Sequence, residues 1–105
     1  MGTIRKFNEY NWVEFVKPSK LSEFGVIHIE YVCVEDWCDN LVFYFTKKDD
    51  NKRYKSIANY QLTKICEYLS SESTTPIKRF EIDDYGRFIE KESKSGKKYN
   101  WFVLE

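Results

Sequence analysis

One histidine and three cysteines are the side chains of this chain best suited to bind a metal ion or to act as a nucleophile. They lie at His28, Cys33, Cys38 and Cys66, with the spacing H-x4-C-x4-C-x27-C. This spacing does not follow the paired-ligand pattern of zinc fingers and knuckles. On a regular strand His28 and Cys33 also point to opposite faces, because their positions differ by an odd number. The sequence therefore predicts no metal site and no cofactor.

Nucleophilic catalysis would need one of these thiols beside the only histidine, His28. Cys38 is expected to be the most accessible thiol, because it lies next to a turn. Its neighbours Glu35, Asp36 and Asp39 are acidic, and negative charge disfavours the reactive thiolate. We therefore expect His28 and the cysteines to be structural residues without a catalytic role.

Metal-dependent nuclease chemistry needs an aspartate close in space to a Glu-x-Lys segment. Asp84 and the segment Glu92-Ser93-Lys94 supply these residue types. The segment falls at the predicted end of a hairpin, where its side chains would be mobile and hydrated. The glycines, at positions 2, 25, 86 and 96, are too scattered to form a phosphate-binding loop. The sequence thus contains no convincing catalytic constellation, and we expect a protein that is not an enzyme.

The elements that would position these side chains centre on the segment Val26–Lys48, the part of the chain richest in β-branched and aromatic residues. Val26–Glu35 and Leu41–Lys48 are predicted to be two strands joined by a turn, since Asp and Asn favour turns. We expect the odd positions of the first strand to face the core, and Leu41, Phe43 and Phe45 to share one face of the second. The odd positions of the first strand that we expect to face the core are Ile27, Ile29, Tyr31 and Cys33.

The segments that flank this hairpin predict one helix and further strands. Trp12–Lys17 is interpreted as a strand, although Phe7, Tyr10, Val13 and Val16 also fit a helical spacing, and Pro18–Gly25 as a loop. A polar loop is expected over Lys48–Lys55, and either Ser56 or Asn59 is expected to cap a helix whose apolar residues recur at helical spacing. Three strands are expected at 77–83, 87–92 and 99–104, with turns at Asp84–Gly86 and Ser93–Lys98.

Together these elements predict an α+β fold in a single domain covering residues 1–105. Its antiparallel sheet would have about five or six strands, with one amphipathic helix at about residues 56–70 packed on one face. The element order would be βββ-α-βββ. A chain of 105 residues is long enough to form one hydrophobic core without disulfide bonds.

The composition and net charge of the chain indicate which kinds of partner, such as nucleic acid or a membrane, it is expected to bind. Seventeen basic and seventeen acidic residues cancel, so no overall field attracts the chain to nucleic acid or to an anionic membrane. The first 15 residues have four charges and no apolar core, and no apolar run approaches the ~20 residues of a membrane helix, so neither a signal peptide nor a membrane partner is expected.

An odd number of cysteines favours free thiols in the cytoplasm. Aromatic residues make up 18% of the chain, which predicts some exposed rings suited to binding.

Protein binding is the preferred functional hypothesis, with the turn after the first long strand as its centre. Trp37 lies there among Glu35, Asp36 and Asp39, where a large ring is difficult to bury, and it would serve as an anchor for a protein partner. The alternative role for this ring is a lid folded back onto the core. Addition of an edge strand, including formation of a homodimer, is a further mode of binding.

The abundance of Lys, Asn, Tyr and Glu resembles the composition of small proteins of AT-rich bacteria and their phages. That resemblance implies an inhibitor, immunity protein or anti-defence factor that blocks a larger protein by binding it. The alternative function is an accessory protein for single-stranded nucleic acid, with an aromatic sheet face and basic loops. The residues proposed for this alternative are Tyr44, Lys47, Lys48, Arg53, Lys97 and Lys98.

Overall fold

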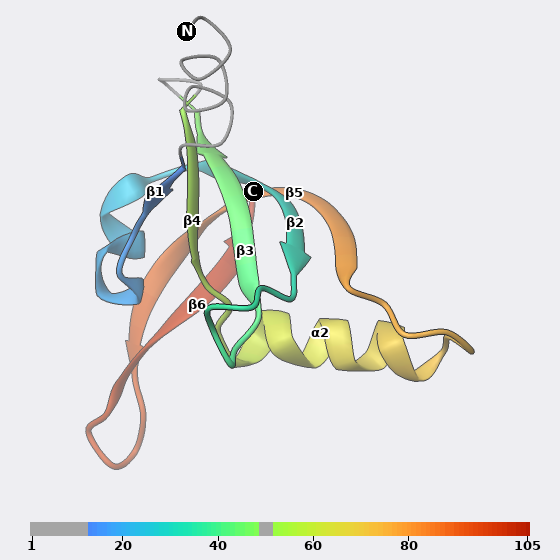
Figure 1. Ribbon diagram of the computed structural model, residues 1–105. Helices are drawn as coiled ribbons and strands as arrows, with labels where there is room; N and C mark the ends of the chain where they lie inside the picture. The colour runs from blue at the N-terminus through green and yellow to red at the C-terminus, as the bar shows by residue number, and fades with distance from the viewer. Residues whose placement is uncertain (1–12, 49–51) are drawn as a thin grey trace, which may run out of the picture.

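The computed structural model describes residues 13–48 and 52–105 of the chain. These residues form a six-stranded sheet with the strand order β1-β4-β3-β2-β5-β6 (Figure 1). All neighbouring strands are antiparallel except β1, which runs parallel to β4. The elements are β1 Glu14–Phe15, the 3-10 helix η1 Pro18–Phe24, β2 Ile27–Cys33, β3 Val42–Lys47, β4 Arg53–Ile57, α2 Tyr60–Ser71, β5 Arg79–Glu92 and β6 Lys98–Leu104. The predicted α+β class with one main helix is confirmed.

Strands β2 and β3 form the hairpin predicted at the centre of the sheet, but β2 contains a bulge. Ile29 pairs with Phe45, whereas Tyr31 pairs with Tyr44, so Glu30 is an extra residue on β2. An extra residue reverses the side-chain alternation beyond it. The core face of β2 therefore consists of Ile27, Ile29 and Val32. The prediction that Tyr31 and Cys33 face the core was wrong, and both lie half-buried on the opposite face. On β3, Phe43 and Phe45 are buried as predicted.

Two segments predicted to be loops are ordered elements. The range Lys48–Lys55 was predicted to be a polar loop, but residues 53–55 belong to β4, in which Tyr54 and Ser56 are buried. The Ser56 hydroxyl donates a hydrogen bond of 2.6 Å to the carbonyl oxygen of Val16, which satisfies a polar group that would otherwise be costly to bury. The predicted loop at 18–25 is mostly the 3-10 helix η1, which inserts Leu21 into the core.

Within the predicted strand Trp12–Lys17, Glu14 and Phe15 form β1 and pair with β4, which confirms the strand at these two residues. Trp12 lies outside the described residues, as do Phe7 and Tyr10 of the helical alternative.

Strand β5 runs without interruption through the turn predicted at Asp84–Gly86, so that prediction was wrong. It is 14 residues long, and its first half pairs with β2 while its second half pairs with β6. Gly86 lies at the crossover and pairs with both Ile27 and Leu104. A Cβ atom at Gly86 would overlap the carbonyl oxygen of Val103 and lie 2.8 Å from a ring carbon of Phe102. Glycine is required here because two backbones meet, not because of a turn.

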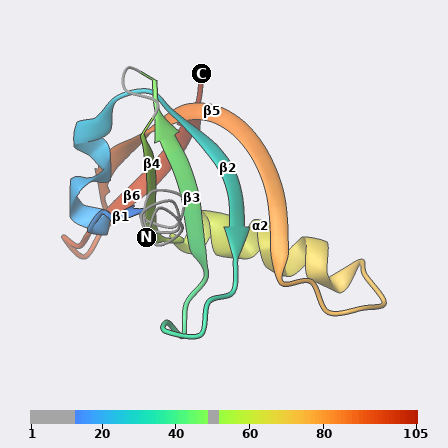
Figure 2. The ribbon, with the colours of Figure 1, turned by 45° about the horizontal axis from the view of Figure 1, so that its top comes forward.

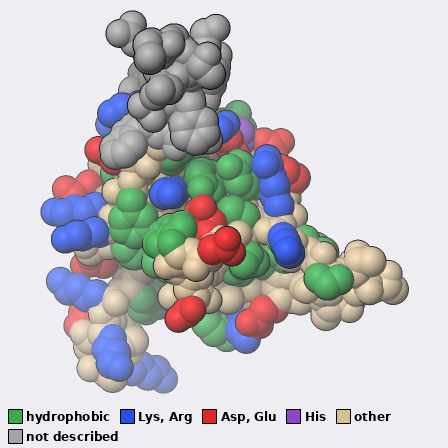
Figure 3. Space-filling model, viewed as in Figure 1, with side chains coloured by type: hydrophobic (Ala, Val, Ile, Leu, Met, Phe, Trp, Pro, Cys, Tyr) green, Lys and Arg blue, Asp and Glu red, His purple; other side chains and the backbone are tan. Residues whose placement is uncertain are grey.

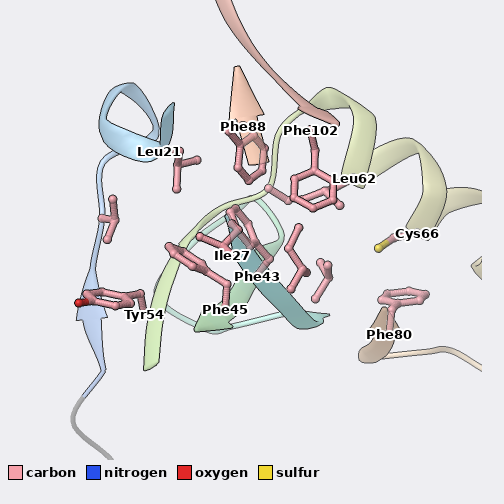
Figure 4. Packing of buried hydrophobic residues seen from close by; sticks show 14 residues of the cluster. Leu21, Ile27, Phe43, Phe45, Tyr54, Leu62, Cys66, Phe80, Phe88 and Phe102 are labelled. Atoms are coloured by element: carbon pink, nitrogen blue, oxygen red, sulfur yellow. The ribbon is translucent and has the colours of Figure 1, made fainter. Parts of the chain in front are cut away.

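The long strand β5 is bent, and the two ends of the sheet therefore curl around one core (Figure 2). Four strands thus precede α2 and two follow it among the described residues, in place of the predicted order of three and three. Within the curl, aromatic rings from β3, β4, β5 and β6 belong to one buried cluster, in which Phe102 lies beside Leu62 and Phe80 beside Cys66 of α2 (Figure 4). The helix begins later than about residue 56, because Ser56 belongs to β4 and Asn59 caps the helix by accepting a hydrogen bond of 2.9 Å from the Leu62 amide.

Side chains from the start of α2 also bind the outer edge of β6. The Gln61 amide donates to the carbonyl oxygen of Phe102 at 2.9 Å and accepts from the Phe102 amide at 2.8 Å. Asn59 donates to the carbonyl oxygen of Asn100 at 2.9 Å. These bonds occupy the backbone groups that an added strand would use, so the centre of this edge is closed in the folded chain.

No helix among residues 13–48 and 52–105 has both the length and the apolar character needed to cross a membrane.

Candidate functional site

A row of directly paired residues crosses five strands on the face of the sheet that points away from the core. The pairs are Phe15 with Lys55, Lys55 with Tyr44, Tyr44 with Tyr31, and Tyr31 with Glu81. Their side chains share one face because directly paired residues of neighbouring strands point the same way. The register brings together side chains that lie up to 66 positions apart in the sequence.

The rings of this row lie in close contact. Tyr31 and Tyr44 are stacked, with 4.7 Å between ring centres and 19° between ring planes. The guanidinium carbon of Arg79 lies 3.7 Å from the centre of the Tyr31 ring, a distance typical of a cation–π contact. Arg79 also forms an ion pair of 2.6 Å with Glu81. The Tyr31 ring is thus covered by Tyr44 and Arg79.

Trp37 lies against the end of this row nearest β1. Its ring meets Phe15 edge to face at 5.9 Å, and the Lys55 ammonium lies 5.1 Å from the ring centre. Trp37 keeps 53% of its surface exposed and Phe15 keeps 43%. The ring therefore does not form a lid on the core, which was the alternative to a binding role.

We define the aromatic face as Phe15, Tyr31, Trp37 and Tyr44. Figure 3 looks onto this side of the sheet and shows hydrophobic side chains gathered over β1, β4 and β3, with acidic side chains below them near the β2–β3 loop. Charged side chains surround this apolar centre, an arrangement typical of protein-recognition surfaces.

Glu35 holds the loop that contains Trp37 onto the sheet. Its carboxylate accepts a hydrogen bond of 2.8 Å from the Tyr44 hydroxyl. The pKa of Tyr44 is well above its ordinary value, mainly because the phenol is partly buried and secondly because it donates this bond to Glu35. The phenol therefore remains a donor at neutral pH. Asp36 and Asp39 are exposed on the same loop, and neither forms an ion pair within the described part of the chain. Of the predicted acidic residues, these two remain available to a partner, whereas Glu35 has a positioning role.

His28 lies beside the aromatic face, where β2 pairs with β5. Its Nε2 atom lies 2.6 Å from Oδ1 of Asp83, and its ring stacks on Tyr85 at 4.2 Å. Asp83 has a φ of 55°, a left-handed conformation that Asp tolerates better than most residues, at the bulge where β5 shifts register against β2. These contacts fix His28 on the sheet surface.

The residues of the nucleic-acid alternative lie in separate places. Tyr44 belongs to the aromatic face, and Arg53 forms an ion pair of 2.8 Å with Glu30. Lys47 lies over the ring of Phe24, at 5.8 Å from its centre, on the core side of the sheet. Lys48 is exposed just beyond the end of β3, and Lys97 and Lys98 lie at the β5–β6 hairpin. The fold therefore does not unite these six residues into one platform.

The three cysteines are free thiols in different environments. Cys66 is in the core, where burial raises the pKa of its thiol to about 11. Burial, with a further contribution from Glu35, also raises the pKa of Cys33. Within the described ranges, no three His, Cys, Asp or Glu side chains are grouped so that they could hold a metal ion.

The motif Asp84 with Glu92-Ser93-Lys94 is spread along β5 and its hairpin. Asp84 pairs with Ile29 of β2, whereas Glu92 pairs with Lys98 at the far end of the same strand. A strand rises about 3.3 Å per residue, so the two carboxylates lie roughly 25 Å apart along β5.

Comparisons of the chain with protein-family models, with curated proteins and with solved structures found no match.

The sequence predicted Trp37 for the partner-binding site and Tyr44 for the nucleic-acid alternative. It wrongly predicted that Tyr31 faces the core, and it gave no prediction for Phe15, Lys55 and Arg79 as members or neighbours of the aromatic face. Phe15 lies in a stretch with two competing periodicities, and Lys55 lies in a segment whose charges favour a loop. The burial of Tyr54, Ser56 and Ala58 alternates with exposed or half-buried neighbours. The residue types do not show this alternation, because Ser56 is polar and Ile57 is apolar.

Proposed function

We propose that this chain is a small protein-binding domain that blocks a larger protein by covering part of its surface with the aromatic face. The observation that carries the proposal is the cluster of Phe15, Tyr31, Trp37 and Tyr44, drawn from four parts of the chain and set among charges of both signs. Trp and Tyr, which supply three of these four rings, are enriched among binding hot spots.

Trp37 is the anchor in this proposal. Its half-exposed ring enters an apolar pocket of the partner, and Asp36 and Asp39 meet basic groups at the rim of that pocket. The bond between Tyr44 and Glu35 and the contact of Lys55 with the Trp37 ring hold the loop in place before binding. A loop ordered in advance loses less conformational entropy on association, so more of the contact energy appears as affinity.

The aromatic face fits a protein better than it fits a nucleic acid. Nucleic acid needs open ring faces and a surplus of positive charge. Here Tyr31 is covered on both sides, and the nearby cations Arg53 and Arg79 are neutralised by Glu30 and Glu81. The proposal involves no cofactor and no catalytic step, and the three free thiols suit a reducing compartment such as the cytoplasm.

The test is a quantitative affinity capture that compares the wild-type chain with Trp37→Ala. The expected result is a specific protein that wild type captures and Trp37→Ala loses, followed by a stable complex of the two purified proteins. Tyr68→Ala is the matched control, because Tyr68 is 64% exposed on α2, away from the aromatic face, and its removal should not affect capture. Circular dichroism establishes that each variant remains folded. Equal capture by wild type and Trp37→Ala would refute the anchor.

A further inference from the structure

The outer face of the β5–β6 hairpin is a second surface with different chemistry. Three directly paired positions point outward there: Arg87 with Val103, Ile89 with Trp101, and Lys91 with Tyr99. The alternate positions point inward, as the buried rings of Phe88 and Phe102 show. We define the hairpin face as Arg87, Ile89, Lys91, Tyr99, Trp101 and Val103.

Apolar and aromatic surface is exposed on the hairpin face. Tyr99 is 45% exposed, Trp101 is 37% exposed and Val103 is 41% exposed. The Lys91 ammonium lies 5.5 Å from the centre of the Trp101 ring, so a cation already accompanies the larger ring. Tyr99 and Trp101 are two residues apart on one strand, which places their Cα atoms about 6.7 Å apart.

The charges of the hairpin face are all positive. Arg87 and Lys91 are exposed, and neither forms an ion pair within residues 13–48 and 52–105. Glu90 and Glu92 flank Lys91 along the strand and lie on its opposite side, where Glu90 pairs with Lys98 at 3.5 Å. Glu105 lies two residues after Val103, beside Tyr85, and it forms no ion pair with Arg87 among the described residues. Lys97, at the tip of the hairpin, adds a third exposed cation. Basic side chains are visible at this tip in Figure 3.

We propose that the hairpin face binds single-stranded nucleic acid. Bases stack on Tyr99 and Trp101, and Arg87, Lys91 and Lys97 lie near the phosphates. Exposed rings beside cations that form no ion pairs are the combination by which proteins hold single strands without reading their sequence. An acidic peptide would also meet the charges, but it would make no specific use of the rings. This site shares no residue with the aromatic face and does not depend on its function.

The test is fluorescence anisotropy with a labelled oligothymidine of roughly 12 nucleotides, a length within the range of known single-strand sites. Wild type is expected to bind at low salt, and the logarithm of its binding constant should fall against the logarithm of salt concentration with a slope of about −2, since three cations each contribute about −0.7. The variant Arg87→Glu/Lys91→Glu should bind at least about tenfold more weakly with a correspondingly shallower slope. Its matched control is Lys20→Glu/Lys64→Glu, which makes the same change in net charge on η1 and α2 and should bind like wild type.

Two aromatic variants test the stacking contribution. Trp101→Ala should weaken binding by roughly tenfold, and Trp101→Phe should restore most of it, because base stacking needs an aromatic ring. No binding of the oligonucleotide by wild type at low salt would overturn the proposal. So would equal binding by wild type and Trp101→Ala, or equal weakening by both charge variants, because the surface would then act only through net charge. Polyglutamate that competes as effectively as the oligonucleotide would overturn it in favour of an acidic peptide.

Discussion

Replacing Gly86 with alanine tests the strand crossover that shapes the whole sheet. Gly86 is the residue at which β5 pairs with β2 on one side and with β6 on the other. An added methyl group would overlap the carbonyl oxygen of Val103, which belongs to a backbone held in the sheet. The methyl group would also lie 2.8 Å from a ring carbon of Phe102, a buried residue. Neither neighbour can move without disturbing the pairing of β6 or the core.

The expected loss is about 3 kcal/mol in the free energy of unfolding, the upper end of the range for overpacking, because backbone must shift. Alanine also restricts the unfolded chain, which offsets at most about 1 kcal/mol of this loss. For a domain of this size, a loss of this magnitude lowers the melting temperature by roughly 12–20 °C. Gly96→Ala provides the contrast, since Gly96 has a φ of 85° and its added methyl group would meet only Glu92, at 3.8 Å. It should lose about 1 kcal/mol from left-handed strain alone.

Urea unfolding followed by circular dichroism measures both variants against wild type. Gly86→Ala should have a lower urea midpoint than Gly96→Ala with an unchanged m-value. If Gly86→Ala is as stable as Gly96→Ala, the two backbones do not meet at this position and the crossover is wrong.

Two further changes test the β6 edge and the buried thiol. Gln61→Ala should lose about 2 kcal/mol of stability, at about 1 kcal/mol for each hydrogen bond to Phe102, and should self-associate as its concentration rises because the strand edge is freed. Sedimentation velocity measures this association, and a monomer at every concentration would count against the role of Gln61 in closing the edge. For Cys66, the folded thiol has a pKa of about 11 against 9.0 in the unfolded chain, so the folded state retains its proton longer and stability should fall as pH rises from about 9 toward 11. Cys66→Ala should flatten this decline, and an unchanged slope would show that other groups cause it.

The parts of the fold that could be predicted from the sequence are those in which local pattern and tertiary position agree. The run Leu62, Cys66 and Leu69 has helical spacing, and Asn59 is a good capping residue, so α2 was found with an error of about one turn at its start. The β2–β3 hairpin was found because its apolar density exceeds that of any other segment. In both cases the residues that define the element also face the core.

The errors arise where long-range pairing overrides local preference. Asp84-Tyr85-Gly86 has the composition of a turn, yet Gly86 serves a close approach between strands that are distant in sequence. The bulge at Glu30 cannot be recognised from the alternation of apolar and polar residues along β2, because both faces of this strand have apolar residues. The charged residues around Lys55 predict a loop, but Lys55 pairs with β1 and β3 and therefore lies in the sheet.

The candidate site was predictable to the extent that it depends on residue type. Trp37 was identified because a large ring among acids is difficult to bury, and it is indeed half exposed. Its neighbours Phe15 and Tyr31 could not be assigned to it, since the register of five strands decides which residues share a face. The role of Glu35 was also hidden, because its bond to Tyr44 depends on where the loop folds back.

The most direct test of the central claim is the affinity of the captured protein partner for wild type and for Trp37→Ala, measured by calorimetry with purified components. Trp37 should behave as a hot spot, so its removal should cost at least about 2 kcal/mol, a roughly thirtyfold loss of affinity, with the fold intact. Equal affinities for the two chains would contradict the assignment of the aromatic face as the binding surface.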